Sequence, residues 1–137
     1  MTNLFVYGSL MYDEVWELIV DGDFEKSKGQ ISGYRRVAVK DEEYPGLVAG
    51  EDIVVGCIWY GVDNNNIRRL DSFEGEYYER IPAQAINEVG DCVEVSVYCF
   101  KKDFHGLLEK KDWDVNEFEK SGLKKFIKRY IGFDQMK

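Results

Sequence analysis

Short runs of β-forming residues, separated by turns, constrain the fold of this chain more than any other feature. Residues 4–7 form an apolar run that stops at a Gly-Ser pair, which predicts a strand followed by a tight turn. Residues 30–40 predict a second strand. Residues 52–62 predict a third, central strand, in which Gly56 indicates a bulge or a close approach of two backbones.

Glycine and proline mark the reversals between the remaining strands. Residues 44–46, with the sequence Tyr-Pro-Gly, predict a turn. Residues 80–88 and 92–101 both alternate between apolar and polar side chains, and only three residues separate them. They predict a hairpin, with Gly90 supplying the turn.

Helical spacing of apolar residues is found in three stretches. Residues 15–19 and 67–73 predict two short helices. Residues 115–130 carry an apolar stripe between Asp114, which begins a capping box, and Gly132, which is typical of a helix end. This stretch predicts the one long helix.

The order of these elements indicates the fold class. Strands alternate with short helices without a regular β-α-β repeat, so we expect an α+β protein. The several hairpin-like pairs favour a small mixed sheet that curls toward a closed β-barrel, with helices packed outside it. At 137 residues, without a linker, residues 1–137 predict a single domain.

The charge balance argues against two classes of partner. A net charge of −8 opposes phosphate backbones and anionic membrane surfaces, so we expect neither nucleic-acid nor membrane binding. The first apolar run is too short for a signal peptide or a membrane span, which predicts a cytoplasmic protein.

Cysteine and histidine are too few and too scattered to indicate a metal centre. Cys57, Cys92 and Cys99 lack C-x-x-C spacing and lie in strand-like runs, so we expect three buried free thiols. His105 is the single histidine. The sequence therefore predicts no metal and no cofactor.

The first candidate site is the turn that joins the first strand to the first short helix. At such a junction, consecutive backbone N–H groups can face a carboxylate or a carbonyl oxygen. The alternative is a simple turn in which a serine caps the helix. The six residues of this turn are Tyr7, Gly8, Ser9, Leu10, Met11 and Tyr12.

The second candidate site is an acidic and aromatic segment around Glu74. A carboxylate flanked by Phe73 and Gly75 at a helix end can turn into an apolar pocket, where desolvation raises its pKa toward the range useful for proton transfer. The alternative is a solvated surface acid.

Four motifs, in this order, resemble the gamma-glutamylcyclotransferase-like family, and in particular its avirulence-induced-gene branch. The resemblance covers roughly residues 3–100. The motifs are Leu4-Phe5-Val6-Tyr7-Gly8-Ser9-Leu10, Tyr44-Pro45 with Leu47-Val48, the Gly56 strand, and Leu70-Asp71-x-Phe73-Glu74-Gly75-x-x-Tyr78-x-Arg80.

The resemblance implies a compact β-barrel and an enzyme that cyclises a gamma-glutamyl group to 5-oxoproline without a cofactor. In this interpretation Glu74 is the general acid/base, and residues 7–12 line the pocket for the glutamyl head. Tyr78 and Arg80 have supporting roles: the ring walls the cavity, and the guanidinium pairs with an acid such as Asp71 or Glu79.

The resemblance leaves three questions open. The turn continues as Met11-Tyr12-Asp13, where the amine-specific branch has a lysine and a glycine, so the leaving group is undefined. The substrate carboxylate requires N–H groups or an arginine, for which Arg35, Arg36 and Arg80 are candidates. Association of two copies as a homodimer is also open.

Two other functions are compatible with the same residues. Ser9 on a strand-to-helix turn could serve a hydrolase as nucleophile, although a G-x-S-x-G elbow is missing and His105 is the sole imidazole. The chain could also be a non-catalytic module that binds a small metabolite or a partner in the same cavity.

Overall fold

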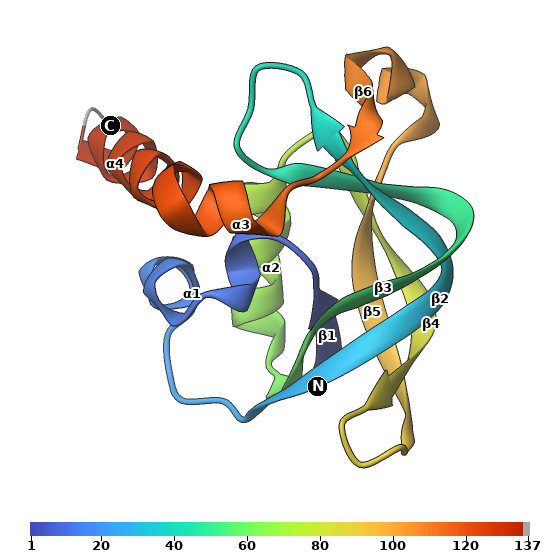
Figure 1. Cartoon of the computed structure of the whole chain (residues 1–137). Coiled ribbons are helices and arrows are strands. Elements are labelled where there is room, and N and C mark those ends of the chain that lie inside the picture. The colour runs from blue at the N-terminus through green and yellow to red at the C-terminus, as the bar shows by residue number, and fades with distance from the viewer. Residues whose placement is uncertain (136–137) are drawn as a thin grey trace.

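The computed structural model describes residues 1–135, with side chains described through Tyr130. Its centre is a six-stranded mixed sheet in the order β3-β1-β5-β4-β2-β6, in which β2 also pairs with β3. That additional pairing closes five strands into a barrel, and β6 extends it (Figure 1). The strands are β1 (Thr2–Val6), β2 (Lys26–Val39), β3 (Pro45–Val62), β4 (Tyr78–Asn87), β5 (Cys92–Phe100) and β6 (Leu108–Asp112).

Helices α1 to α4 gather on one side of the barrel, as Figure 1 shows. The 3-10 turn η1 and the helix α1 follow β1, and α2 joins β3 to β4. The remaining helical segments follow β5 and β6. Their bounds are η1 (Ser9–Met11), α1 (Asp13–Ile19), α2 (Asn64–Glu74), η2 (Lys102–Leu107), α3 (Val115–Glu117), the π-helical η3 (Phe118–Gly122) and α4 (Leu123–Gln135).

Strand pairing explains why the barrel is mixed. β1 runs parallel to β5, whereas β1 with β3, β2 with β3, and β4 with β5 are antiparallel. β2 and β3 are long and change register around Tyr34, where their pairing is irregular. The predicted α+β class and curled mixed barrel with outer helices are confirmed.

Two groups of buried side chains hold the barrel together. One fills the barrel interior with residues that come almost entirely from strands, including Phe5, Ile58 and Val97. The other lies between the barrel wall and the helices and includes Leu4 and Trp16. Leu4 and Phe5 are consecutive residues of β1, and their side chains therefore point to opposite faces of the strand.

Gly56 lies where two backbones approach closely, as the sequence predicts. A Cβ atom at this position would collide with the carbonyl oxygen of Val6 and would lie 2.8 Å from the ring of Phe5. The absence of a side chain at position 56 therefore lets β3 pass against β1 and the turn that follows it.

Several local predictions need correction. Of the predicted Tyr-Pro-Gly turn at residues 44–46, Tyr44 lies in a bend, whereas Pro45 and Gly46 already belong to β3. The predicted long helix is divided by the π-helical segment η3 and continues past Gly132 to Gln135. β6 and η2 have no periodicity that would reveal them, because they are short and mostly polar.

The cysteines are free, but only Cys99 is buried; Cys57 is intermediate and Cys92 is exposed. Cys92 begins β5 beside the turn of the hairpin, opposite Ile86, where its side chain is exposed to solvent. Within residues 1–135, no helix combines the length and apolar character needed to cross a bilayer.

Candidate active site

The turn after β1 brings backbone groups and the Tyr7 side chain to one recess. Gly8 precedes η1 and lies so close to Pro45 that a Cβ atom at position 8 would be 2.7 Å from the proline Cδ. In the described chain, the N–H groups of Ser9 and Leu10 donate to no other protein group. The first N–H groups of a helix lack intrahelical partners, and these two remain available for a ligand.

Two long side chains hold the turn in place from outside the recess. The Trp59 indole Nε1 donates to the Leu10 carbonyl oxygen at 3.1 Å. The Arg36 guanidinium Nη1 donates to the carbonyl oxygens of Tyr7, at 2.8 Å, and Val55, at 3.1 Å. Because these bonds use carbonyl groups, they leave the N–H groups of Ser9 and Leu10 free.

The end of α2 brings Glu74 to the same recess. Ile67 and Leu70 are buried against the barrel and fix the helix, while Asp71 lies on its exposed side. The helix ends at Gly75, which has a φ of 80° and donates its N–H to the Asp71 carbonyl at 3.1 Å. Glycine adopts this backbone conformation readily, so the chain turns away immediately after the carboxylate.

The recess has an inner and an outer compartment. The inner compartment, about 30 Å³, includes Glu74, the turn after β1 and the rings of Tyr78 and Tyr98. The outer compartment, about 160 Å³, shares Glu74 and adds the aromatic side chains of Phe73 and Phe126. Their complete linings are Phe5, Val6, Tyr7, Gly8, Ser9, Leu10, Tyr44, Pro45, Glu74, Tyr78 and Tyr98 for the inner, and Ser9, Tyr44, Phe73, Glu74, Tyr78 and Phe126 for the outer.

The surroundings of the Glu74 carboxyl group favour its protonated form. Desolvation by the neighbouring protein atoms, with a smaller contribution from the negative charge of Asp71, raises the pKa of Glu74 to about 8. The residue as a whole is half-buried, so water reaches its edge while protein surrounds the carboxyl group. No described side chain hydrogen bonds to it or forms an ion pair with it.

Asp71, by contrast, is fully engaged one helical turn before Glu74. Its Oδ1 accepts hydrogen bonds from Arg80 Nε at 3.0 Å and from the Tyr98 hydroxyl at 2.7 Å. Arg80 Nη2 donates to its other oxygen at 3.3 Å. The two acids therefore have different environments: Asp71 is an ion-paired acid that fixes α2, and Glu74 is a desolvated acid that faces the recess.

The tyrosines around Glu74 are neutral hydrogen-bond donors. The Tyr78 hydroxyl donates to the Pro45 carbonyl at 2.7 Å, and the Tyr7 hydroxyl donates to the Tyr98 carbonyl. Burial, and then the negative charge of Glu74 or of other tyrosines, raises the pKa of Tyr7 and Tyr78 well above the ordinary value. Their rings are thereby fixed as walls of the recess.

The structure brings most of the predicted residues together. Tyr7, Gly8, Ser9, Leu10, Glu74 and Tyr78 line the inner compartment. Arg80 lies outside the recess but pairs with Asp71, as anticipated. Ser9 is not a helix cap, since η1 begins without a side-chain cap and α1 is preceded by Tyr12.

Met11 and Tyr12 lie outside the lining, contrary to the prediction that the pocket extends to residue 12. The tight 3-10 turn carries both away from the recess. The Met11 carbonyl accepts a hydrogen bond from Lys26 at 3.0 Å, and the Tyr12 hydroxyl donates to Glu119 at 2.9 Å. A six-residue window in the sequence could not show where this turn leaves the cavity.

The lining also includes residues that sequence reasoning did not assign to the site. Tyr44 and Pro45 belong to a motif used for the family resemblance, so a signal for them was present. Tyr98 and Phe126 had no local signal, because one is an alternating residue of β5 and the other belongs to the stripe of α4. Only the tertiary fold brings them to Glu74.

The other predicted groups lie elsewhere. Arg35 pairs with Asp112 at 3.2 Å, and His105 Nε2 lies 3.3 Å from the Phe100 carbonyl oxygen. Neither lines the recess. Among the described residues, no group of three or more His, Cys, Asp or Glu side chains is arranged to hold a metal ion.

The fold and the recess define a closed mixed-barrel protein in which a desolvated carboxyl group lies beside a turn with two free backbone amides. Sequence comparison narrows this class. A sequence model of the family "Gamma-glutamyl cyclotransferase, AIG2-like" matches residues 4–115. The chain belongs to this family.

Individual relatives agree with this assignment. AIG2-like protein D of Arabidopsis thaliana is 27% identical over 135 residues, which cover 93% of this chain and 86% of the relative. A solution structure of an Arabidopsis thaliana protein has a TM-score of 0.74 and 26% identity, covering 98% of this chain and 82% of that one. A structure of gamma-glutamyl cyclotransferase has a TM-score of 0.63 and 17% identity, covering 73% of this chain and 66% of its own, and shows the fold alone.

Proposed function

We propose that this protein is a cofactor-independent gamma-glutamylcyclotransferase, in which Glu74 transfers protons while a gamma-glutamyl amide closes to 5-oxoproline and releases an amine. One observation carries the proposal: the Glu74 carboxyl group, which has no partner among the described side chains, borders the same recess as the free amides of Ser9 and Leu10. A base without a partner and N–H donors without acceptors are complementary to a substrate that has an ammonium group and a carbonyl oxygen.

The reaction needs no nucleophile from the protein. The α-amino nitrogen of the substrate attacks its own γ-carbonyl carbon, forming the lactam C–N bond, and the bond from this carbon to the leaving nitrogen breaks. Ionised Glu74 takes a proton from the ammonium group and delivers it to the departing amine. Holding the bent conformer is worth effective molarities of roughly 10⁵–10⁸ M for well-oriented intramolecular reactions.

The turn after β1 supplies the complementary donors. The amides of Ser9 and Leu10 hydrogen bond either to the acyl oxygen or to the α-carboxylate of the substrate, and both roles use the positive end of the turn. The inner compartment of about 30 Å³ has room for about one water molecule without ligand. Binding of the glutamyl head therefore requires its walls to move apart, and side-chain rotations of this kind are common on binding.

The direct test is to incubate the protein with a panel of gamma-glutamyl amides and dipeptides and to measure 5-oxoproline by mass spectrometry. We expect release of 5-oxoproline and of the matching amine in equal amounts. Binding without turnover on any member would instead identify a non-catalytic module that uses the same recess.

The pH dependence of the reaction should report the ionisation of Glu74. Since the proposed reaction starts from the carboxylate, kcat/KM should rise with pH up to about 8, the pKa of Glu74 in the free protein. It should fall again where the substrate ammonium loses its proton. A profile that is already flat from pH 5 to pH 8 would contradict a role for this desolvated carboxylate as the base.

Ser9→Ala separates the cyclase from a serine hydrolase. The cyclase uses the backbone N–H of residue 9, which alanine retains, so we expect kcat/KM to change by less than about tenfold, the effect of one modest hydrogen bond. A serine nucleophile would be lost completely. His105 lies outside the lining of the recess, which also favours the cyclase. Abolished turnover in Ser9→Ala, with intact substrate binding, would overturn this interpretation.

A further inference from the structure

The outer compartment has a wall that comes from the C-terminal helix. Phe126 of α4 faces Phe73 of α2 edge-on, with ring centroids 5.9 Å apart, and both rings line the compartment together with Tyr44 and Tyr78. Four of its six lining residues are therefore aromatic. An apolar cavity of about 150 Å³ accommodates a benzene molecule, so a volume of about 160 Å³ has room for a ring-sized group.

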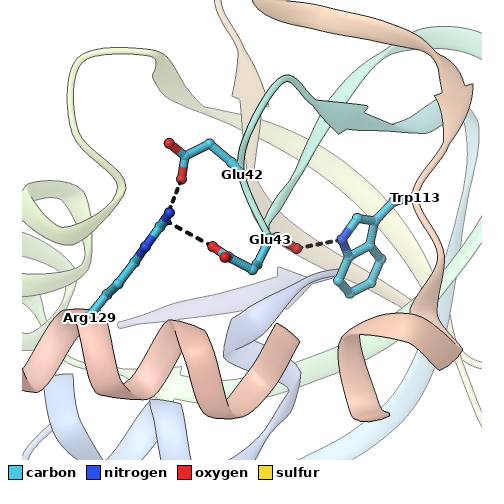
Figure 2. A network of polar contacts seen from close by, with 4 residues as sticks. All are labelled: Glu42, Glu43, Trp113 and Arg129. Carbon is cyan, nitrogen blue, oxygen red and sulfur yellow. Dashed lines mark hydrogen bonds and ion pairs between the residues drawn. The ribbon is translucent and has the colours of Figure 1, made fainter. Parts of the chain in front are cut away.

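Phe126 is held in this position from two sides. Its ring lies 6.3 Å from that of Phe118 in the π-helical segment η3. Three residues further along α4, Arg129 Nη1 contacts Glu42 at 3.1 Å and Glu43 at 2.9 Å, as Figure 2 shows. Each of these surface pairs contributes little by itself, but two carboxylates on one guanidinium form a small network.

The loop that contains Glu42 and Glu43 is also held by a second contact. The Trp113 indole Nε1 donates to the Glu43 carbonyl oxygen at 2.7 Å (Figure 2). The next residues along the chain, Tyr44 and Pro45, line the recess. Contacts from Arg129 thus join helix α4 to the loop of residues 42–45, directly beside the recess. Phe126 of the same helix is part of the wall of the outer compartment.

The charges around the outer compartment disfavour an anionic leaving group. Among the residues with described side chains, no lysine or arginine lines either compartment. Arg129, on the same helix as Phe126, is already paired with two carboxylates. A carboxylate on the leaving group would therefore be desolvated beside Glu74 without a cation to pair with.

Resting on the proposed function, we infer that the outer compartment receives an uncharged apolar leaving group, and that Phe126 is the specificity-determining residue for it. The preferred substrates are then gamma-glutamyl amides whose amine carries a bulky apolar or aromatic group. The glutamyl head lies toward Glu74 and the turn after β1, and the apolar group lies between Phe73 and Phe126.

The test compares gamma-glutamyl-phenethylamide with gamma-glutamyl-methylamide, two substrates that differ in the apolar group of the leaving amine. We expect the native protein to favour the phenethyl compound in kcat/KM by about tenfold or more, because a hydrophobic pocket discriminates by 10–200-fold for small changes in apolar size. Phe126→Ala should remove most of this preference, because it should lower kcat/KM for the phenethyl compound much more than for the methyl compound. Phe126→Leu, which keeps much of the bulk, should lie between them.

Lys128→Ala is the matched control, because this exposed residue belongs to the same helix and does not line the cavity. It should keep the native preference. Circular dichroism and thermal unfolding of each variant show whether the fold is retained. An unchanged ratio of the two kcat/KM values in folded Phe126→Ala, or a native preference for gamma-glutamyl amino acids, would overturn the inference.

Calorimetric binding separates this inference from the proposed function. If the native protein turns over neither these compounds nor any member of the gamma-glutamyl panel, the cyclase proposal fails, but the binding of both compounds can still be measured. Tighter native binding of the phenethyl compound, lost in Phe126→Ala and kept in Lys128→Ala, would support the inference by itself. Equal binding of the two compounds, or binding of neither, would overturn it.

Discussion

Replacing Glu74 with glutamine should lower the rate of 5-oxoproline release by about 10²–10⁴-fold, the usual contribution of a general acid/base. Glutamine has nearly the same shape as glutamate but cannot accept a proton from the ammonium group. The fold should be unaffected, since no described protein group hydrogen bonds to the Glu74 carboxyl group. The measurement is kcat for the best gamma-glutamyl substrate, with circular dichroism of both proteins.

Glu76→Gln provides the matched control. It removes the same charge two residues further along the chain, where the side chain is exposed and does not line the recess. We expect this variant to retain nearly full activity. Full activity in Glu74→Gln would remove the carboxyl group from the mechanism, and a large loss in both variants would indicate a general effect of charge.

The same substitution should also change how stability depends on pH. Desolvation raises the pKa of Glu74 from 4.5 to about 8 in the folded chain. Between these pH values the folded state binds more protons at this residue than the unfolded state does, so stability falls as pH rises through the interval. Each pKa unit corresponds to about 1.4 kcal/mol, which makes the penalty at pH 9 of the order of a few kcal/mol.

Urea unfolding of the native protein and Glu74→Gln at pH 5, 7 and 9 measures this effect. Other titrating groups are common to both proteins and cancel in the difference. Glutamine and protonated glutamate are similar, so we expect the two free energies of unfolding to be close at pH 5. At pH 9 Glu74→Gln should be the more stable protein. A difference that is constant across this range would mean that Glu74 titrates normally and is well solvated.

Stability and function are thus opposed at this residue. A charge at Glu74 is unfavourable in the empty recess, and a bound substrate ammonium group would relieve that penalty by pairing with it. Asp71, held by Arg80 and Tyr98, contributes to keeping the proton affinity of its neighbour high. Residues that destabilise a protein locally in this way are common at functional sites.

The sequence was sufficient to predict the parts of this arrangement that depend on local order. The strand that ends at a Gly-Ser turn, the short helix that ends at Glu74 and the hairpin around Gly90 each depend on neighbouring residues. Two glycines could also be interpreted from their places in the sequence: Gly56 allows a close approach of two backbones, and Gly75 ends α2.

The parts that the sequence did not reveal depend on contacts between distant segments. The sheet brings β1 against β5, and the fold places Tyr98 of β5 beside Asp71 of α2; neither contact has a periodic signature. Phe126 has the spacing of an ordinary core residue of α4, yet it lines the outer compartment. Met11 and Tyr12 follow the turn in sequence, but the geometry of the 3-10 turn carries them away from the recess.

Product analysis in H₂¹⁸O tests the central claim most directly. Cyclisation uses the substrate's own amine as nucleophile and adds no water, so we expect 5-oxoproline without ¹⁸O from the native protein, released about 10²–10⁴-fold more slowly by Glu74→Gln. Glutamate carrying ¹⁸O in its γ-carboxylate would show that water or a serine-bound intermediate attacks the carbonyl group, and would contradict the account.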